Sequence, residues 1–201
     1  MNFITFVMLL FISNKGKKMS RKYKFNEKNG VYFTSFATVY WIDVFIRDCY
    51  FESIINALDY CRKNKGMQIY GYCIMPSHVH LLFQAEHQNP SDLIRDLKTF
   101  TSKAIVKQII ENVQESRKEW LLWMFERAAQ KYSYVKRYQF WQHHNQPIEI
   151  YSDKFFNEKL HYIHQNPVIS GFVCEPQDWK YSSAKNYGEE RDAVLEIDIC
   201  A

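Results

Sequence analysis

Apolar positions along the chain switch between strand spacing and helix spacing. Residues 30–41 (GVYFTSFATVYW) are rich in Val, Phe, Tyr and Thr, which predicts a long strand. Residues 49–64 carry apolar side chains at helical intervals and are followed by a lysine and a glycine, which predicts a helix with a glycine stop. Residues 68–75 and 78–85 predict two further strands, joined as a hairpin across Pro76.

The second half of the chain continues with helical patterns. Residues 89–110 open with Asn-Pro-Ser-Asp, a helix start, and keep an apolar side as far as the isoleucines at the end. Residues 113–131 predict a further amphipathic helix, and residues 138–141 (YQFW) are a candidate strand. Residues 152–165 predict a last helix that begins at a serine N-cap and is ended by Pro167.

The order strand, helix, strand, strand, helix needs one more strand to complete a βαββαβ arrangement. We therefore expect an α+β fold of the ferredoxin-like (RRM-like) class, with an antiparallel sheet, helices packed on one face, and an extra C-terminal helix. The absence of internal repeats and of flexible linkers predicts a single domain over residues 19–201.

The N-terminal segment has a different character. Phe3 to Ile12 is apolar but too short to span a bilayer, and it lacks the preceding basic flank and the cleavage site of a secretory signal. Met19 is followed by a conventional soluble start. We expect residues 1–18 to be a non-native or disordered upstream extension, and a membrane anchor is the less favoured alternative.

Composition narrows the class without deciding the function. The 201 residues are 47% hydrophobic, enough to build one substantial core, and five scattered cysteines without a C-x-x-C pair suggest reduced thiols in a cytoplasmic protein. The net charge of +4 is compatible with a polyanionic partner but does not establish one.

Two histidines flank one apolar residue in the segment Pro76-Ser77-His78-Val79-His80. Side chains alternate along a strand, so if Val79 faces the core, both imidazoles project from the other face and can hold a metal ion. Taken alone, the pair is better explained as two surface histidines without a ligand. The Asp-His continuation typical of many metallo-hydrolases is replaced here by leucines.

Tyr162 and Asn166 form a second pair, because residues four apart share a helix face. Leu160 and Ile163 belong to the apolar stripe that would dock this helix. Two interpretations are open. In one, Tyr162 is a packing residue and Asn166 a C-terminal cap. In the other, Tyr162 is a nucleophile and Asn166 an oxygen ligand of the metal held by the histidines.

Four segments in order carry a family resemblance: PSHVHLL, FWQHHNQPIEI, KLHYIHQNPV and EPQDWKYSSAKNY. Together they resemble the REP-associated tyrosine transposases, IS200-like enzymes of the single-tyrosine branch of the HUH superfamily. The resemblance runs from about Tyr32 to Tyr187. One departure is the region 111–134, which looks longer than in compact members and bears on the last strand and on any dimer interface.

The resemblance implies roles for four residues: His78, His80 and Asn166 as metal ligands and Tyr162 as nucleophile. Imidazole and amide donors suit Mn²⁺, and Mg²⁺ where phosphate and water complete the site. The implied reaction is cleavage of single-stranded hairpin DNA, which leaves a 5′-phosphotyrosine link and a free 3′-OH that can later attack it. A homodimer is a further possible partner arrangement, and no membrane is involved.

DNA contacts are harder to place from sequence. Basic residues on the predicted helix 89–110 and in the basic-aromatic stretch 131–138 can bind phosphates beside stacked bases, or can be an ordinary solvated face. The candidates are Arg95, Lys98, Lys103, Lys136 and Arg137.

Three functions compete at this stage. A DNA strand-transferring enzyme uses the histidines, the tyrosine and the asparagine together. A non-catalytic module that binds single-stranded nucleic acid fits the same fold but needs no such set. A metal-dependent hydrolase with water as nucleophile leaves Tyr162 without a role.

Overall fold

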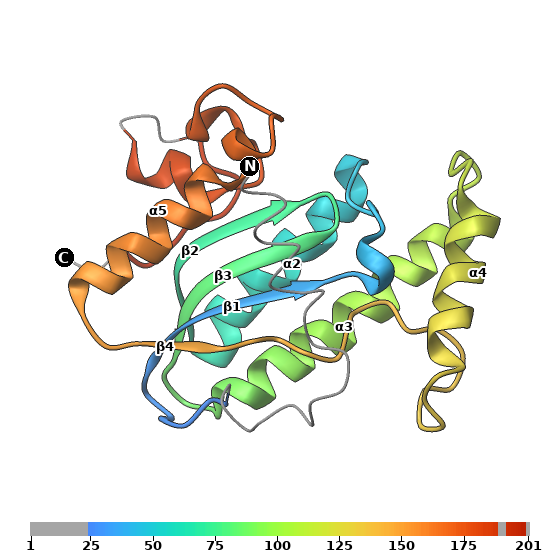
Figure 1. The fold of residues 1–201 in the computed structure, drawn as a ribbon, viewed down its shortest axis with the longest axis horizontal. Coiled ribbons are helices and arrows are strands. Elements are labelled where there is room, and N and C mark those ends of the chain that lie inside the picture. The colour runs from blue at the N-terminus through green and yellow to red at the C-terminus, as the bar shows by residue number, and fades with distance from the viewer. Residues whose placement is uncertain (1–23, 189–191, 200–201) are drawn as a thin grey trace, which may run out of the picture.

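The computed structural model describes residues 24–188 and 192–199. A four-stranded antiparallel sheet lies at its centre, in the spatial order β2-β3-β1-β4 (Figure 1). The strands are β1 (Val31–Ala37), β2 (Met67–Met75), β3 (His78–Ala85) and β4 (Ile148–Ile150). The helices are α2 (Asp48–Lys65), α3 (Pro90–Glu111), α4 (Lys118–Ala129) and α5 (Asp153–Ile169). This α+β arrangement confirms the predicted fold class.

The two faces of the sheet carry two hydrophobic clusters. Val79, Leu81 and Phe83 of β3 are fully buried in the larger cluster, which also contains the apolar sides of α2 and α3. Leu82 points the other way, into a smaller cluster that receives Ile163 of α5. Val79 lies in the core, which is the condition under which the sequence places both imidazoles on the other face. His78 and His80 therefore belong to the face that α5 covers.

Local signals set the helix ends. Asn89 caps α3 by accepting a hydrogen bond from the backbone N–H of Ser91, and Ser152 caps α5 through Phe155. Gly66 ends α2 with a φ of 64°, a left-handed conformation that glycine adopts without steric cost. These boundaries agree with those predicted from sequence.

The predicted strand over 138–141 is wrong. Trp141 forms an isolated bridge with Thr38, but neighbouring Phe140 and Trp141 both enter the larger core cluster. Consecutive residues of a regular strand point to opposite faces, so this segment cannot extend as one. The sheet is completed instead by β4, which pairs with β1.

The predicted strand over 30–41 also ends early, at Ala37. Val39–Trp41 form a 3₁₀ turn, η1, in which Tyr40 and Trp41 have φ values of 56° and 57°. A strand-rich composition cannot reveal this turn, because aromatic residues seldom adopt left-handed backbone angles.

Pro167 does not end α5, which continues to Ile169. Proline removes one backbone N–H from the helix, yet the next turn still closes through a 3.0 Å bond from the Ser170 N–H to the Asn166 carbonyl. Asn166 therefore lies within the helix, and its interpretation as a C-terminal cap is wrong. The predicted helix over 113–131 is shorter than expected and corresponds to α4.

No helix among residues 24–188 and 192–199 has the length and apolar character needed to cross a bilayer. The predicted extension, residues 1–18, lies outside the described residues.

The segment that follows α5 covers the free edge of β2. The Ile74 N–H donates to the Tyr181 carbonyl at 2.9 Å, and the Trp179 indole N–H donates to the Ile74 carbonyl at 3.0 Å. The Ser183 hydroxyl oxygen accepts a hydrogen bond of 2.9 Å from the backbone N–H of Tyr72. An otherwise open strand edge is thereby paired and shielded.

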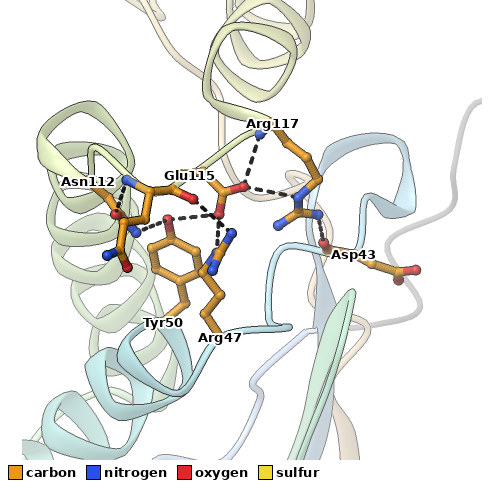
Figure 2. A network of polar contacts seen from close by, with 7 residues as sticks. Asp43, Arg47, Tyr50, Asn112, Glu115 and Arg117 are labelled. Atoms are coloured by element: carbon orange, nitrogen blue, oxygen red, sulfur yellow. Dashed lines mark hydrogen bonds and ion pairs between the residues drawn. The ribbon is translucent and has the colours of Figure 1, made fainter.

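A buried carboxylate joins the start of α2 to the α3–α4 connection (Figure 2). Glu115 accepts hydrogen bonds from Arg47 Nε at 2.9 Å and from the Tyr50 hydroxyl at 3.1 Å. Its second oxygen accepts from the Arg117 N–H and Nε at 3.1 and 3.2 Å. Burial alone would raise the pKa of Glu115, but the bonds from Arg117 and Arg47 outweigh it and lower the pKa to about 2.

We expect Glu115→Gln to lower the free energy of unfolding at pH 7 by roughly 2–3 kcal/mol, because it leaves two guanidinium groups without their carboxylate. A depressed pKa stabilises the fold above the unfolded value near 4.3 and loses that effect as the pH falls toward 2. The difference between the two proteins should therefore shrink by about half at pH 3. Urea titrations at both pH values measure it.

Asp59→Asn is the matched control, because Asp59 forms an exposed pair with Lys63 on α2. It should change the unfolding free energy by less than about 0.5 kcal/mol. Equal effects of the two variants would contradict the role given to Glu115.

Candidate metal centre and nucleophile

His78, His80, Tyr162 and Asn166 converge on the sheet face beneath α5. The Asn166 side-chain amide lies 3.2 Å from Nε2 of His80. The rings of His78 and His80 are 4.8 Å apart, and the rings of His80 and Tyr162 are 5.2 Å apart, measured between centroids. The helix that bears the tyrosine thus packs on the histidine strand of the same chain.

The β2–β3 turn holds the first histidine in place. The Pro76 carbonyl accepts a 2.9 Å hydrogen bond from the Phe45 N–H, and the Ser77 carbonyl accepts one of the same length from the Thr38 N–H. Both donors belong to the segment between β1 and α2. His78, the first residue of β3, therefore follows a turn that is anchored on both of its central residues.

Close packing places α5 against the sheet. A Cβ atom at Gly71 of β2 would lie 2.7 Å from Cδ1 of Leu160, so glycine lets the helix approach at this point. Ile163 is fully buried against the sheet. His164 bonds through Nε2 to the Ser183 hydroxyl at 2.9 Å, which ties the helix to the β2 edge segment and gives this histidine a structural role.

Each of the two site histidines has a serine partner at Nδ1. Ser35 Oγ lies 2.6 Å from Nδ1 of His80, which it faces across the β1–β3 ladder, and Ser77 Oγ lies 3.2 Å from Nδ1 of His78. A ring whose Nδ1–H is held by a hydroxyl keeps its lone pair on Nε2. Such partners orient imidazole rings for a metal ion.

Burial keeps both imidazoles neutral. It lowers the pKa of His78 to about 4, against an opposing contribution from the Asn166 hydrogen bond, and it holds the pKa of His80 well below its ordinary value. Neutral imidazole is the form that coordinates a metal.

The donor set also limits the kind of metal. Within the described part of the chain no three His, Cys, Asp or Glu side chains gather, so the available donors are His78, His80 and the Asn166 amide. Rotation of the amide by half a turn presents its oxygen in place of its nitrogen. Two imidazoles and an amide oxygen fit a divalent ion such as Mn²⁺ or Mg²⁺, with positions left open.

Tyr162 is held in a partly buried, protonated state. Burial raises the pKa of its hydroxyl, and hydrogen bonding with Asn166 offsets part of that rise. The Phe33 ring meets the tyrosine ring edge to face at 5.8 Å. At neutral pH the hydroxyl keeps its proton, so it needs activation before it can act as a nucleophile.

Lys159 is a site residue that the sequence pattern did not single out. Its Nζ lies 5.1 Å from the ring centres of Phe33 and Phe155 and 5.9 Å from that of Tyr162. Burial lowers the pKa of this ammonium group. Its position three residues before Tyr162, on the same face of the helix, was the available signal.

The five candidate DNA contacts do not gather around this site. Arg95, Lys98 and Lys103 belong to α3, which packs on the opposite face of the sheet, and Lys136 and Arg137 follow α4. Lys103 and Lys136 are exposed. A role in DNA binding stays a prediction for all five.

Three of these cations have partners within the protein. Arg95 pairs with Asp92 and Asp96 on its own helix. Arg137 pairs with Glu126. Lys98 donates from Nζ to the Gln142 carbonyl at 2.7 Å and to the Asn145 side chain, so it anchors the loop before β4, and burial lowers its pKa to about 8.

Sequence comparisons find similar known proteins. The family model described as IS200-like transposase matches residues 32–164. A curated Haemophilus influenzae protein assigned as a REP-associated tyrosine transposase is 28% identical over 174 residues, which cover 85% of each chain.

Two solved structures are also similar. A REP-associated tyrosine transposase bound to a REP hairpin shares the fold with a TM-score of 0.60 at 16% identity, over 92% of this chain and 94% of that one. A protein of Deinococcus radiodurans assigned as a transposase matches with a TM-score of 0.43 at 18% identity, over 73% of this chain and 95% of its own.

Proposed function

The chain belongs to the IS200-like transposase family, as its motifs indicated, and we propose on this premise that it cleaves and rejoins single-stranded DNA through Tyr162. Members of this family are enzymes that act on DNA. The observation that carries the proposal is the arrangement of Tyr162, His80 and Asn166, since Asn166 lies within hydrogen-bond reach of His80 and also interacts with the tyrosine hydroxyl.

The substrate we propose is hairpin DNA. The solved relative of similar fold is bound to a REP hairpin, and the curated relative is assigned as REP-associated. A hairpin leaves unpaired strands at its foot, and we place the scissile phosphate in such a strand. We expect the protein to act in the cytoplasm, where such DNA is found.

In the cleavage step the Tyr162 hydroxyl attacks the scissile phosphorus. A tyrosine–phosphate bond forms as the Tyr162 hydroxyl gives its proton to water. The bond from phosphorus to the 3′ oxygen breaks, and the leaving oxygen takes a proton from water to become a free 3′-OH. When held by His78, His80 and Asn166, a divalent ion such as Mn²⁺ or Mg²⁺ would supply Lewis-acid polarisation of the phosphate.

The remaining residues hold the reacting groups. Asn166 orients the tyrosine hydroxyl, and the walls formed by Phe33 and His80 fix its ring. Lys159 presents a positive charge to the anionic phosphate beside Tyr162. Rejoining is the reverse step: a 3′-OH attacks the phosphotyrosine, and Tyr162 recovers its proton, so no external energy source is needed.

Tyr162→Phe should abolish the covalent adduct, because it removes the attacking oxygen and keeps the ring. The assay uses labelled single-stranded oligonucleotides that form hairpins, with self-complementary stems of several sequences and randomised flanks, incubated with Mn²⁺ and resolved on a denaturing gel. His78→Ala should abolish the adduct as well, whereas Tyr151→Phe, a change at an exposed tyrosine just before α5, should not.

The other candidate functions give different results in the same assay. DNA binding without an adduct, under any metal, would favour a non-catalytic module. Cleavage that survives Tyr162→Phe would favour a hydrolase that uses water.

Ser35→Ala should weaken Mn²⁺ binding by about 10- to 100-fold, because His80 loses the hydroxyl that fixes its ring. Isothermal titration calorimetry with manganese chloride measures this without DNA. Ser102→Ala on α3 is the control and should leave the affinity unchanged. Equal affinities of the two variants for Mn²⁺ would contradict the role of Ser35 in orienting His80.

Lys159→Met should slow adduct formation by about 10- to 100-fold, since a half-buried charge near the phosphate is worth roughly 1.5–3 kcal/mol. Methionine keeps the apolar stem over Phe33 and Phe155. Lys154→Met, at an exposed position on the same helix, controls for loss of general positive charge. An unchanged rate in Lys159→Met would contradict the proposed phosphate contact.

A further inference from the structure

A pocket of about 330 Å³ opens beside the metal centre, within the size range of ligand sites. Its walls come from the η1 turn, the end of α4 and the segment 131–144, which are distant in sequence. Trp41 lines the pocket, and its ring also meets the ring of His78 edge to face at 5.3 Å. The pocket therefore adjoins the site where we place the scissile phosphate.

The η1 turn holds two aromatic residues in a strained backbone conformation. Tyr40 and Trp41 both have left-handed φ values, which are unfavourable for bulky side chains. Buried Thr38 keeps the turn closed, because its hydroxyl donates to the Ile42 carbonyl at 2.7 Å and also reaches the Ser77 carbonyl at 3.1 Å. Both residues line the pocket, and Tyr40 is 39% exposed and Trp41 47% exposed.

The opposite wall combines aromatic, basic and amide groups. Lys131 places its Nζ 4.8 Å from the Tyr40 ring centre. The rings of Tyr132 and His143 meet edge to face at 4.2 Å. Exposed aromatic faces beside a cation are the elements that stack a nucleobase and bind its phosphate.

Gln139 adds a polar group whose bonding is incomplete. The side chain lines the pocket and is 8% exposed, and its Nε2 donates to the Trp141 carbonyl at 3.1 Å. Its Oε1 has no hydrogen-bond partner among the described residues. A buried carbonyl oxygen without a partner is costly, and a ligand with an amino group can satisfy it after a small shift of the side chain.

We propose that this pocket binds one unpaired nucleobase of the DNA strand that adjoins the scissile phosphate. The base stacks against the rings of Tyr40 and Tyr132, and Lys131 contacts the neighbouring backbone phosphate. Gln139 favours a base with an exocyclic amino group, which thymine lacks. The assignment rests on the proposed function, and it identifies the part of the substrate that sets the position of cleavage.

The test uses the hairpin oligonucleotide most enriched among the sequenced adducts of the unaltered protein. An abasic residue is placed at each position flanking the cleavage site in turn, and the adduct yield is measured. We expect one position to lower the yield by roughly 5- to 100-fold, as loss of one stacked base does. The sequenced adducts should carry adenine, guanine or cytosine at that position.

Two variants of the pocket test whether it holds the base at the sensitive position. Tyr132→Leu keeps an apolar side chain without an aromatic face, and Tyr40→Asn keeps a residue that tolerates the left-handed turn. In both, the intact oligonucleotide should lose yield, and the abasic change at the sensitive position should have little further effect. Tyr60→Leu, at an exposed tyrosine on α2, should retain the full sensitivity, and melting temperatures confirm that each variant is folded.

The outcomes separate this proposal from the one on which it rests. If the unaltered protein forms no adduct, the proposed function fails and the pocket assignment fails with it. If it forms adducts but no flanking position is sensitive, or if both pocket variants keep the original sensitivity, the pocket assignment alone is overturned.

Discussion

The register of β3 in the sheet is the constraint on which the site depends. Ser35 faces His80 and Phe36 faces Val79 across the β1–β3 ladder, and the fully buried Val79 fixes which face each neighbour takes. A slip of one residue would turn both histidines into the core and bring Val79 to the site. The same register brings Ser35 to Nδ1 of His80, so the orientation of this imidazole and the packing of the core share one cause.

The second half of the site depends on how α5 meets the sheet. Gly71 admits the helix at close range, Ile163 anchors it, and His164 ties it to the segment that covers the β2 edge. Tyr162 and Asn166 are placed by these contacts, because neither belongs to the fully buried set that docks the helix. The tyrosine helix packs on its own chain, so one chain presents all four site residues.

The segment between β1 and α2 contains a strained turn and the contacts that stabilise it. The left-handed turn at Tyr40 and Trp41 is held by Thr38, and the chain just beyond it is fixed by the Glu115 cluster through Arg47. Figure 1 shows how this region lies next to α4 at one end of the sheet. These contacts fix the backbone that carries Tyr40 and Trp41 along the wall of the pocket.

Sequence alone determined the elements that rest on local rules: the alternation in β3, the caps at Asn89 and Ser152, and the pairing of Tyr162 with Asn166 on one helix face. These follow from periodicity and capping, which need no distant partner. The tertiary structure decided what depends on long-range packing. It excluded the 138–141 strand and carried α5 past Pro167. It also placed Lys159 over Phe33 of β1 and Trp41 beside His78, because each of these contacts joins residues that lie far apart in the chain.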